Sequence, residues 1–154
     1  MKNTLRIYTD GACAGNPGPG GWGVMLQYAN NTKEIFGYEL QTTNNRMEIK
    51  AAIEALKVLK NSYMHNIEIY TDSKYLQDGI TKWIHKWLKN NWRTSSNKLV
   101  KNSDLWQQLY LELDKHNHVL WYWVKGHSDS AGNDAADKLA RLAKEEAIKM
   151  LRCQ

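Results

Sequence analysis

The order of strand-like and helix-like segments is the feature that most constrains the fold of this chain. Three strand-like segments come first, separated only by loop and turn residues, and two later ones are each preceded by helix-like sequence. Strands joined by turns pair antiparallel, and strands separated by helices usually pair in parallel. The order therefore predicts an α/β fold with a mixed five-stranded sheet, three strands antiparallel and the later ones added in parallel, flanked by helices. We expect strands at 4–10, 22–28, 33–40, 66–72 and 118–124, and helices at 44–60, 73–80, 81–91, 103–116 and 133–151.

The chain is long enough for one domain with a substantial core. Its 154 residues include 42% hydrophobic and 24% charged residues, which is typical of a globular protein. No low-complexity linker and no fixed-period repeat divides the sequence. We therefore expect a single domain over residues 1–154, with the last few residues disordered.

Composition also bears on location and partners. No long apolar run opens the chain and no segment resembles a membrane span, which argues against a signal peptide and a membrane partner. Cys13 and Cys153 have neither metal-ligand nor disulfide spacing, so a reducing cytoplasm is the default. A formal charge of +5 favours an anionic partner such as nucleic acid, although basicity alone is weak evidence. We expect a cytoplasmic monomer.

A glycine-rich loop at 11–21 raises the question of a nucleotide cofactor. It follows a strand, as a dinucleotide fingerprint does, but Pro17 and Pro19 interrupt it. A strand follows it where a phosphate-binding loop would lead into a helix N-terminus. No P-loop sequence occurs elsewhere. We therefore expect no nucleotide cofactor such as ATP or NAD.

The sequence IYTD occurs twice and ends two predicted strands with Asp10 and Asp72. Turn chemistry or helix capping can explain either aspartate by itself. If the two strands lie side by side in parallel, however, both carboxylates emerge at the same edge of the sheet, where α/β proteins bind ligands. The two aspartates are therefore candidates for one site.

Glu48 is a third candidate acid. On a helix it lies in line with Ala52 and Ala55, whereas Lys50 and Glu54 lie on the opposite, solvent side. A favourable helix dipole explains an acid in the first turn, but it does not explain the inward direction. Carboxylates about 4 Å apart repel by roughly 4 kcal/mol at an effective dielectric near 20, so converging acids must hold protons or bind cations. Oxygen ligands without a Cys/His cluster favour Mg²⁺ or Mn²⁺ over Zn²⁺.

The C-terminal part adds a histidine and a fourth acid. His127 lies in a loop with Gly and Ser in which it could move, although a lone surface histidine is the simpler interpretation. In the last helix Asp137 lies closer to the apolar line than Asp134, which shares a solvent stripe with Lys138. Asp137 is therefore the better candidate. We interpret His116 and His118 as surface residues.

A basic segment with tryptophans lies between Asp78 and Asp104, where the sequence contains no acid. On a helix its first four basic residues form one stripe, and two tryptophans form the neighbouring stripe. A lysine stripe is usually a solvated face and a tryptophan stripe is usually core, but a basic face with aromatic anchors also suits a nucleic-acid backbone. The stripe residues are Lys82, Lys86, Lys89 and Arg93, with Trp83 and Trp87 beside them.

Together these segments resemble ribonuclease H of the type 1, bacterial class. The resemblance covers nearly the whole chain, and five motifs in order make it specific. They are YTDGACAGNPGPGGWG, TTNNRMEIKAAIEAL, YTDSKYLQDGITKWIHKW, VKNSDLW and WVKGHSDSAGNDAADKLA. The resemblance implies a mixed five-stranded sheet and endonucleolytic hydrolysis of the RNA strand in RNA·DNA hybrids, leaving 5′-phosphate and 3′-hydroxyl ends.

The resemblance also assigns site residues. It places the family's carboxylate tetrad on Asp10, Glu48, Asp72 and Asp137, holding two Mg²⁺ ions for which Mn²⁺ is a substitute, and the family's mobile histidine on His127. It implies RNA contacts near Cys13, Asn16, Asn44, Asn45 and Glu48, and a DNA-phosphate pocket at Thr43 and Asn102. Trp83, Lys86 and Lys89 match a basic protrusion at about 80–101 that contacts DNA.

The chain also departs from the family pattern. Gln41 stands where a basic residue often supports the phosphate pocket, Lys74 where a glutamine often contacts RNA, and the loop at 128–132 adds Asp129. Two alternatives remain open. One is a different nuclease or strand-transfer enzyme of the same fold, and the other is a non-catalytic hybrid-binding module.

Overall fold

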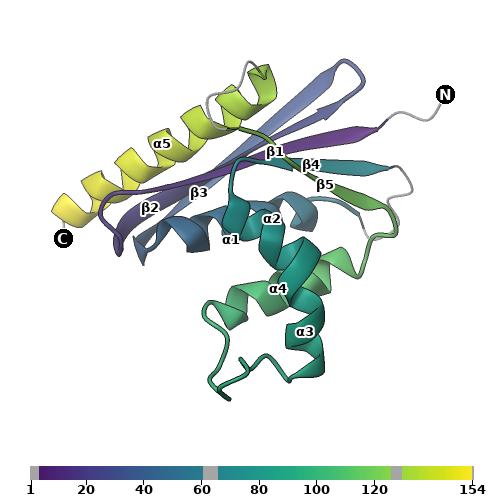
Figure 1. Cartoon of the computed structure of the whole chain (residues 1–154). Helices are drawn as coiled ribbons and strands as arrows, with labels where there is room; N and C mark the ends of the chain where they lie inside the picture. Colours follow the sequence, from purple (N-terminus) through teal and green to yellow (C-terminus); the bar gives the residue numbers. More distant parts are fainter. Residues whose placement is uncertain (1–3, 61–65, 126–129, 154) are drawn as a thin grey trace.

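A computed structural model of the chain describes residues 4–60, 66–125 and 130–153. Its strands form one five-stranded sheet with the order β3-β2-β1-β4-β5, shown in Figure 1. β1 pairs antiparallel with β2, and β2 with β3, whereas β4 joins β1 in parallel and β5 joins β4 in parallel. The predicted mixed sheet is confirmed. The strands are β1 (Leu5–Cys13), β2 (Gly18–Tyr28), β3 (Asn31–Thr42), β4 (Ile67–Thr71) and β5 (Val119–Trp123).

Helices cover both faces of the sheet. α1 (Asn44–Lys57) packs on one face, and α5 (Ala131–Arg152) crosses β1, β2 and β3 on the other (Figure 1). Glycines of the sheet show how closely each helix approaches the strands. A Cβ on Gly11 would lie 2.7 Å from the backbone nitrogen of Glu48 in α1, and one on Gly23 would lie 2.5 Å from the carbonyl oxygen of Ala136 in α5.

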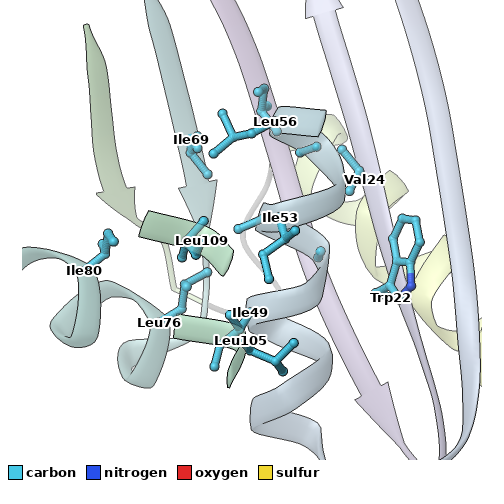
Figure 2. Close-up of a cluster of buried hydrophobic side chains, with 14 of the residues drawn as sticks. Trp22, Val24, Ile49, Ile53, Leu56, Ile69, Leu76, Ile80, Leu105 and Leu109 are labelled. Atoms are coloured by element: carbon cyan, nitrogen blue, oxygen red, sulfur yellow. The ribbon is translucent and has the colours of Figure 1, made fainter. Parts of the chain in front are cut away.

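The main core lies between the sheet and the helices on the α1 face. Alternate residues of β1 and β4, such as Ile7 and Ile69, are fully buried there because side chains of a strand alternate between faces. α1 contributes Ile49, Ile53 and Leu56, and α4 (Ser103–Leu113) packs against it (Figure 2). The other described helices are α2 (Lys74–Asp78), the π-helical segment η1 (Gly79–Trp83) and α3 (Ile84–Lys89).

Several element boundaries differ from the sequence prediction. β1 and β2 continue through residues 11–13 and 18–21, which the glycines and prolines had suggested were loop. β1 and β2 stay paired there, with the register running from Asp10 opposite Gly23 to Cys13 opposite Gly20. The small residues of this segment allow the pairing because they fit between the packed helices. Two separate helices were predicted at 73–80 and 81–91, but α2, η1 and α3 follow one another without a break from Lys74 to Lys89.

The prediction that His116 is a surface residue is wrong. α4 ends at Leu113, and the backbone N–H of His116 then donates to the Leu113 carbonyl at 3.0 Å. This turn folds His116 inward, leaving it 8% exposed, and burial lowers the pKa of its imidazole. His118, two residues later, is exposed as predicted.

Two further findings concern the described residues as a whole. Among them, no helix is long and apolar enough to cross a membrane. Cys13 and Cys153 are both free thiols, the first partly buried and the second exposed. The described part of the chain is therefore held together by packing and hydrogen bonding, without a cross-link between these cysteines.

Candidate active site

Three of the predicted acids lie together at the end of the central strands. Asp10, Glu48 and Asp72 each offer one carboxylate oxygen, and these oxygens all lie within 4.8 Å of one another. Asp10 is on β1 and Asp72 directly follows β4, where the parallel register pairs Thr9 with Thr71. The structure thus places both IYTD aspartates at one edge of the sheet, and Glu48 reaches them from α1.

Local sequence explains how α1 delivers Glu48. The Thr43 hydroxyl caps α1 by accepting from the Arg46 N–H at 3.2 Å, which fixes where the helix begins. Glu48 then points inward on the buried face with Ala52 and Ala55, as its helical angle predicts. Gly11, directly after Asp10, has no side chain to keep the α1 backbone away. Its N–H donates to Asp10 Oδ1 at 2.9 Å and orients that carboxylate.

Burial of these acids makes their charged forms costly. Asp10 is 5% exposed and Glu48 4% exposed, while Asp72 is half-buried. Burial, followed by the charge of Asp72, raises the pKa of Asp10 to about 8. Burial, followed by the charges of Asp10 and Asp72, raises the pKa of Glu48 well above its ordinary value, and burial also raises that of Asp72. Without a cation the cluster therefore retains protons near neutral pH.

The cluster fits a hard divalent cation. Three carboxylates at close range supply only oxygen ligands, which suit Mg²⁺ or Mn²⁺. Glu48 Oε1 is buried and has no hydrogen-bond partner within the described part of the chain. A buried carboxylate oxygen without a donor is costly, and a bound cation would satisfy it. Asp10, Glu48 and Asp72 are therefore the residues that would hold a metal.

Asp137 lies next to this cluster but is paired differently. It sits on α5, half-buried, and its Oδ2 forms an ion pair with Arg141 Nη2 at 3.0 Å. Its charge raises the pKa of Asp72, and a hydrogen bond with it raises that of Asp10, so α5 brings it close to both. The three-acid group found among the described residues does not include it. His127 and Asp129 lie outside the described residues.

The predicted RNA-contacting residues lie on β1, on the β1–β2 connection and on the first turn of α1. Asn16 Oδ1 accepts the backbone N–H of Asn44 at 3.0 Å, which ties the β1–β2 connection to the start of α1. Cys13 Sγ lies 3.5 Å from the carbonyl oxygens of Gly18 and Thr42. Asn44 and Asn45 are exposed. Asn16, Asn44 and Asn45 therefore present exposed amide side chains where the β1–β2 connection meets the start of α1.

Thr43 and Asn102 are linked through Arg46. Thr43 caps the Arg46 N–H, and the Arg46 side chain donates from Nη1 to Asn102 Oδ1 at 3.2 Å. Arg46 also makes two bonds to the Asp104 carboxylate, at 3.0 and 2.7 Å. Asn102 has φ 63°, a left-handed conformation that asparagine tolerates, and its amide donates to the Tyr75 hydroxyl at 3.0 Å. The two predicted phosphate-pocket residues therefore belong to one network.

The basic segment forms a protrusion built from α3 and the loop after it (Figure 1). A series of aromatic contacts runs from Trp92 through Trp87 to the fully buried Trp106, with ring centroids 6.3 and 5.3 Å apart. Trp83 continues this series at 5.9 Å from Trp87 and remains 37% exposed. Lys86 and Lys89 are exposed. The tryptophans thus anchor a protrusion whose cations face solvent.

Comparison with known proteins decides the family. The RNase H family model matches residues 2–145. The chain belongs to the RNase H family. A protein named Ribonuclease H from Rickettsia felis is 65% identical over 154 residues, covering 100% of this chain and 99% of the relative. A protein named Ribonuclease HI from Rickettsia prowazekii is 61% identical over 153 residues, covering 99% of each.

Solved structures agree with this RNase H assignment. LC9-RNase H1, described as a type 1 RNase H with the type 2 active-site motif, matches with a TM-score of 0.83 and 33% identity over 96% of this chain and 74% of that one. LC11-RNase H1, solved in complex with an RNA/DNA hybrid, matches with a TM-score of 0.69 and 24% identity over 94% of this chain and 99% of that one. At 24% identity, the similarity to LC11-RNase H1 shows a shared fold only.

Two residues of this RNase H family member were missed by sequence reasoning. Arg46 is hydrogen-bonded to both Thr43 and Asn102, while Gln41 is exposed. The position of Arg46 in the first turn of α1 does not by itself indicate this role, because the acceptor Asn102 lies far along the chain. Trp123 donates its indole N–H to the carbonyl of Asp72 at 3.0 Å. Nothing in the local sequence distinguishes it from Trp121, because only the register of β5 decides which tryptophan reaches Asp72.

Proposed function

We propose that this chain is an endoribonuclease that hydrolyses the RNA strand of RNA·DNA hybrids, leaving 5′-phosphate and 3′-hydroxyl ends. The observation that carries the proposal is the convergence of Asp10, Glu48 and Asp72 in a chain of the RNase H family. A pure binding module has no need for clustered acids whose pKa values are raised by burial and by their mutual repulsion. The names of the Rickettsia relatives support the same activity.

The acids would act as metal ligands. Asp10, Glu48, Asp72 and Asp137 would hold Mg²⁺, with two ions per site during catalysis. Bound divalent ions supply an activated water and stabilise charge on the reacting phosphate and its leaving oxygen. Asp10 interacts electrostatically with Asp72 and Asp137, and its charge also acts on Glu48, which suits a shared ligand. To bind the metal, the Asp137 carboxylate would have to give up its ion pair with Arg141.

Polar residues outside the acid cluster would distinguish the two strands of the hybrid. Cys13, Asn16, Asn44 and Asn45, on β1, the β1–β2 connection and the start of α1, would contact the RNA strand, where a 2′-hydroxyl can be read in the minor groove. Thr43 and Asn102, held together by Arg46, would receive a DNA phosphate. For His127 we propose assistance in proton movement or product release. The single catalytic domain, the monomeric state and the cytoplasmic location stay predictions.

One assay tests the activity. Labelled RNA·DNA hybrid, duplex RNA, single-stranded RNA and duplex DNA are each incubated with the chain in Mg²⁺ and then in EDTA. We expect the chain to cleave only the RNA·DNA hybrid, to do so in Mg²⁺ but not in EDTA, and to leave 5′-phosphate products. Cleavage of duplex DNA would favour another nuclease of this fold, and hybrid binding without cleavage in Mg²⁺ would favour a binding module.

The protrusion gives a second prediction. Replacing Lys86 and Lys89 together with alanine should raise the KM for hybrid while leaving kcat within about 2-fold, because exposed cations on a backbone contribute to binding. The slope of log affinity against log salt should fall by about 2, one for each lost phosphate contact. Lys149→Ala on the far part of α5 is the control for loss of an exposed lysine. An unchanged salt slope would exclude these two lysines from the interface.

A further inference from the structure

The backbone of Asp72 is held from the neighbouring strand in an unusual way. Asp72 lies just beyond the end of β4, so the regular ladder no longer supports its carbonyl. The Trp123 indole N–H donates to that carbonyl at 3.0 Å. One residue further on, the Val124 N–H donates to the Thr71 carbonyl at 2.8 Å. The end of β5 therefore fixes the Thr71–Asp72 segment at two consecutive carbonyls.

The indole is itself held in place by Lys74. The Lys74 ammonium lies 4.7 Å from the centroid of the Trp123 ring, within the range of a cation–π contact. Lys74 is the first residue of α2, whose start is fixed because Ser73 Oγ accepts from the Leu76 N–H at 3.0 Å. The ring thus links the end of β5 to the start of α2.

Core packing does not account for this arrangement. Trp123 is 41% exposed and is absent from the buried cluster that α1, α4 and the sheet share. Asp72, in turn, is less buried than Asp10 or Glu48, so packing constrains its position least. A directional bond to its backbone is the kind of support that this half-buried acid needs.

We propose that Trp123, braced by Lys74, is a positioning residue for Asp72. It keeps the Asp72 carboxylate at the distance from Asp10 and Glu48 at which one divalent cation can be bound. Mg²⁺ demands near-ideal octahedral geometry with short bonds, so a loosened ligand weakens its binding. The inference rests on the proposed function only in taking Asp72 as a metal ligand.

Trp123→Phe tests the proposal, because phenylalanine keeps an aromatic face for Lys74 and removes the N–H. Titration calorimetry without hybrid should give Mg²⁺ affinity about 3- to 10-fold weaker, at or below the 10- to 100-fold typical of groups that orient metal ligands. At saturating Mg²⁺ the KM for hybrid should stay within about 2-fold. Lys74→Met, at an exposed position, should weaken Mg²⁺ affinity in the same direction by about 2- to 3-fold.

Tyr122→Phe is the matched control. It removes one hydrogen-bonding group, the hydroxyl, from the adjacent residue, which lies on the opposite face of β5. Its Mg²⁺ affinity should equal that of the unmodified chain. Unchanged Mg²⁺ affinity in Trp123→Phe, or an equal loss in Tyr122→Phe, would overturn the positioning role. If the unmodified chain binds Mg²⁺ and cleaves no hybrid, the proposed function fails, yet weaker Mg²⁺ binding in Trp123→Phe would still support the positioning role.

Discussion

Replacing Asp10 by asparagine is expected to abolish hybrid cleavage and also to stabilise the metal-free protein at neutral pH. The amide keeps the size of the carboxyl group and can still accept from the Gly11 N–H, but it is a poor ligand for a hard cation. We expect cleavage to fall by about 10³-fold or more, because charge stabilisation by bound metal is a dominant part of phosphodiester hydrolysis. Hybrid binding should be retained.

The stabilisation follows from the raised pKa. Asp10 has a pKa of about 8 in the folded protein and an ordinary value of 3.8, so the folded state holds the proton more tightly than the unfolded chain does. The free energy of unfolding therefore falls as pH rises between those two values. Asparagine has no proton to lose. In EDTA the variant should match the unmodified protein near pH 4 and exceed its stability by about 2–4 kcal/mol near pH 8.

Urea unfolding in EDTA across this pH range measures the difference, and Asp134→Asn serves as the control. Asp134 is exposed on the solvent side of α5, so its replacement should change stability by less than about 0.5 kcal/mol at every pH. Adding Mg²⁺ should stabilise the unmodified protein and leave Asp10→Asn unchanged, because only a site that binds the ion gains stability from it. Cleavage by Asp10→Asn at the unmodified rate would contradict the metal role.

The sheet and the three-acid cluster could be predicted because they follow from local rules. Alternation identified the strands, the presence or absence of a helix between strands separated parallel from antiparallel pairing, and the helical angle of Glu48 turned it inward toward Asp10 and Asp72. The extent of β1 and β2 could not be predicted, because glycine and proline near Gly18 read as loop. Only their fit beneath α1 and α5 makes them strand.

The roles of the residues that support the site depend on contacts between segments far apart in the sequence, and local sequence patterns do not predict such contacts. Arg46 reads as one more exposed cation in a first turn until Asn102, far along the chain, supplies its acceptor. Trp121 and Trp123 read alike in sequence, and the pairing of Thr71 with Trp123 decides which one reaches Asp72. His116 read as surface because the turn after α4 that buries it has no distinct sequence signal.

Gly11→Ala should damage both stability and metal binding. A Cβ at this position would lie 2.7 Å from the Glu48 nitrogen and 2.7 Å from the Met47 carbonyl carbon, and neither backbone atom can rotate away. α1 must then move off the strand and take Glu48 with it. We expect a loss of about 2–4 kcal/mol in the free energy of unfolding, at or above the usual range for overpacking. Cleavage should fall about 10²-fold, as for ångström-scale misplacement of a catalytic group.

Gly15→Ala separates this effect from simple backbone strain. Gly15 has φ +74°, so alanine there is strained, but its Cβ would meet only the Pro17 carbonyl oxygen at 3.3 Å, away from α1. That variant should lose about 1 kcal/mol of stability and keep its Mg²⁺ affinity. Gly11→Ala should require about 10-fold more Mg²⁺ for half-maximal stabilisation in thermal unfolding. If both variants kept the same Mg²⁺ requirement, the contact between Gly11 and α1 would not be what places Glu48 beside Asp10, and the position of α1 would have to depend on Thr43 and the core alone.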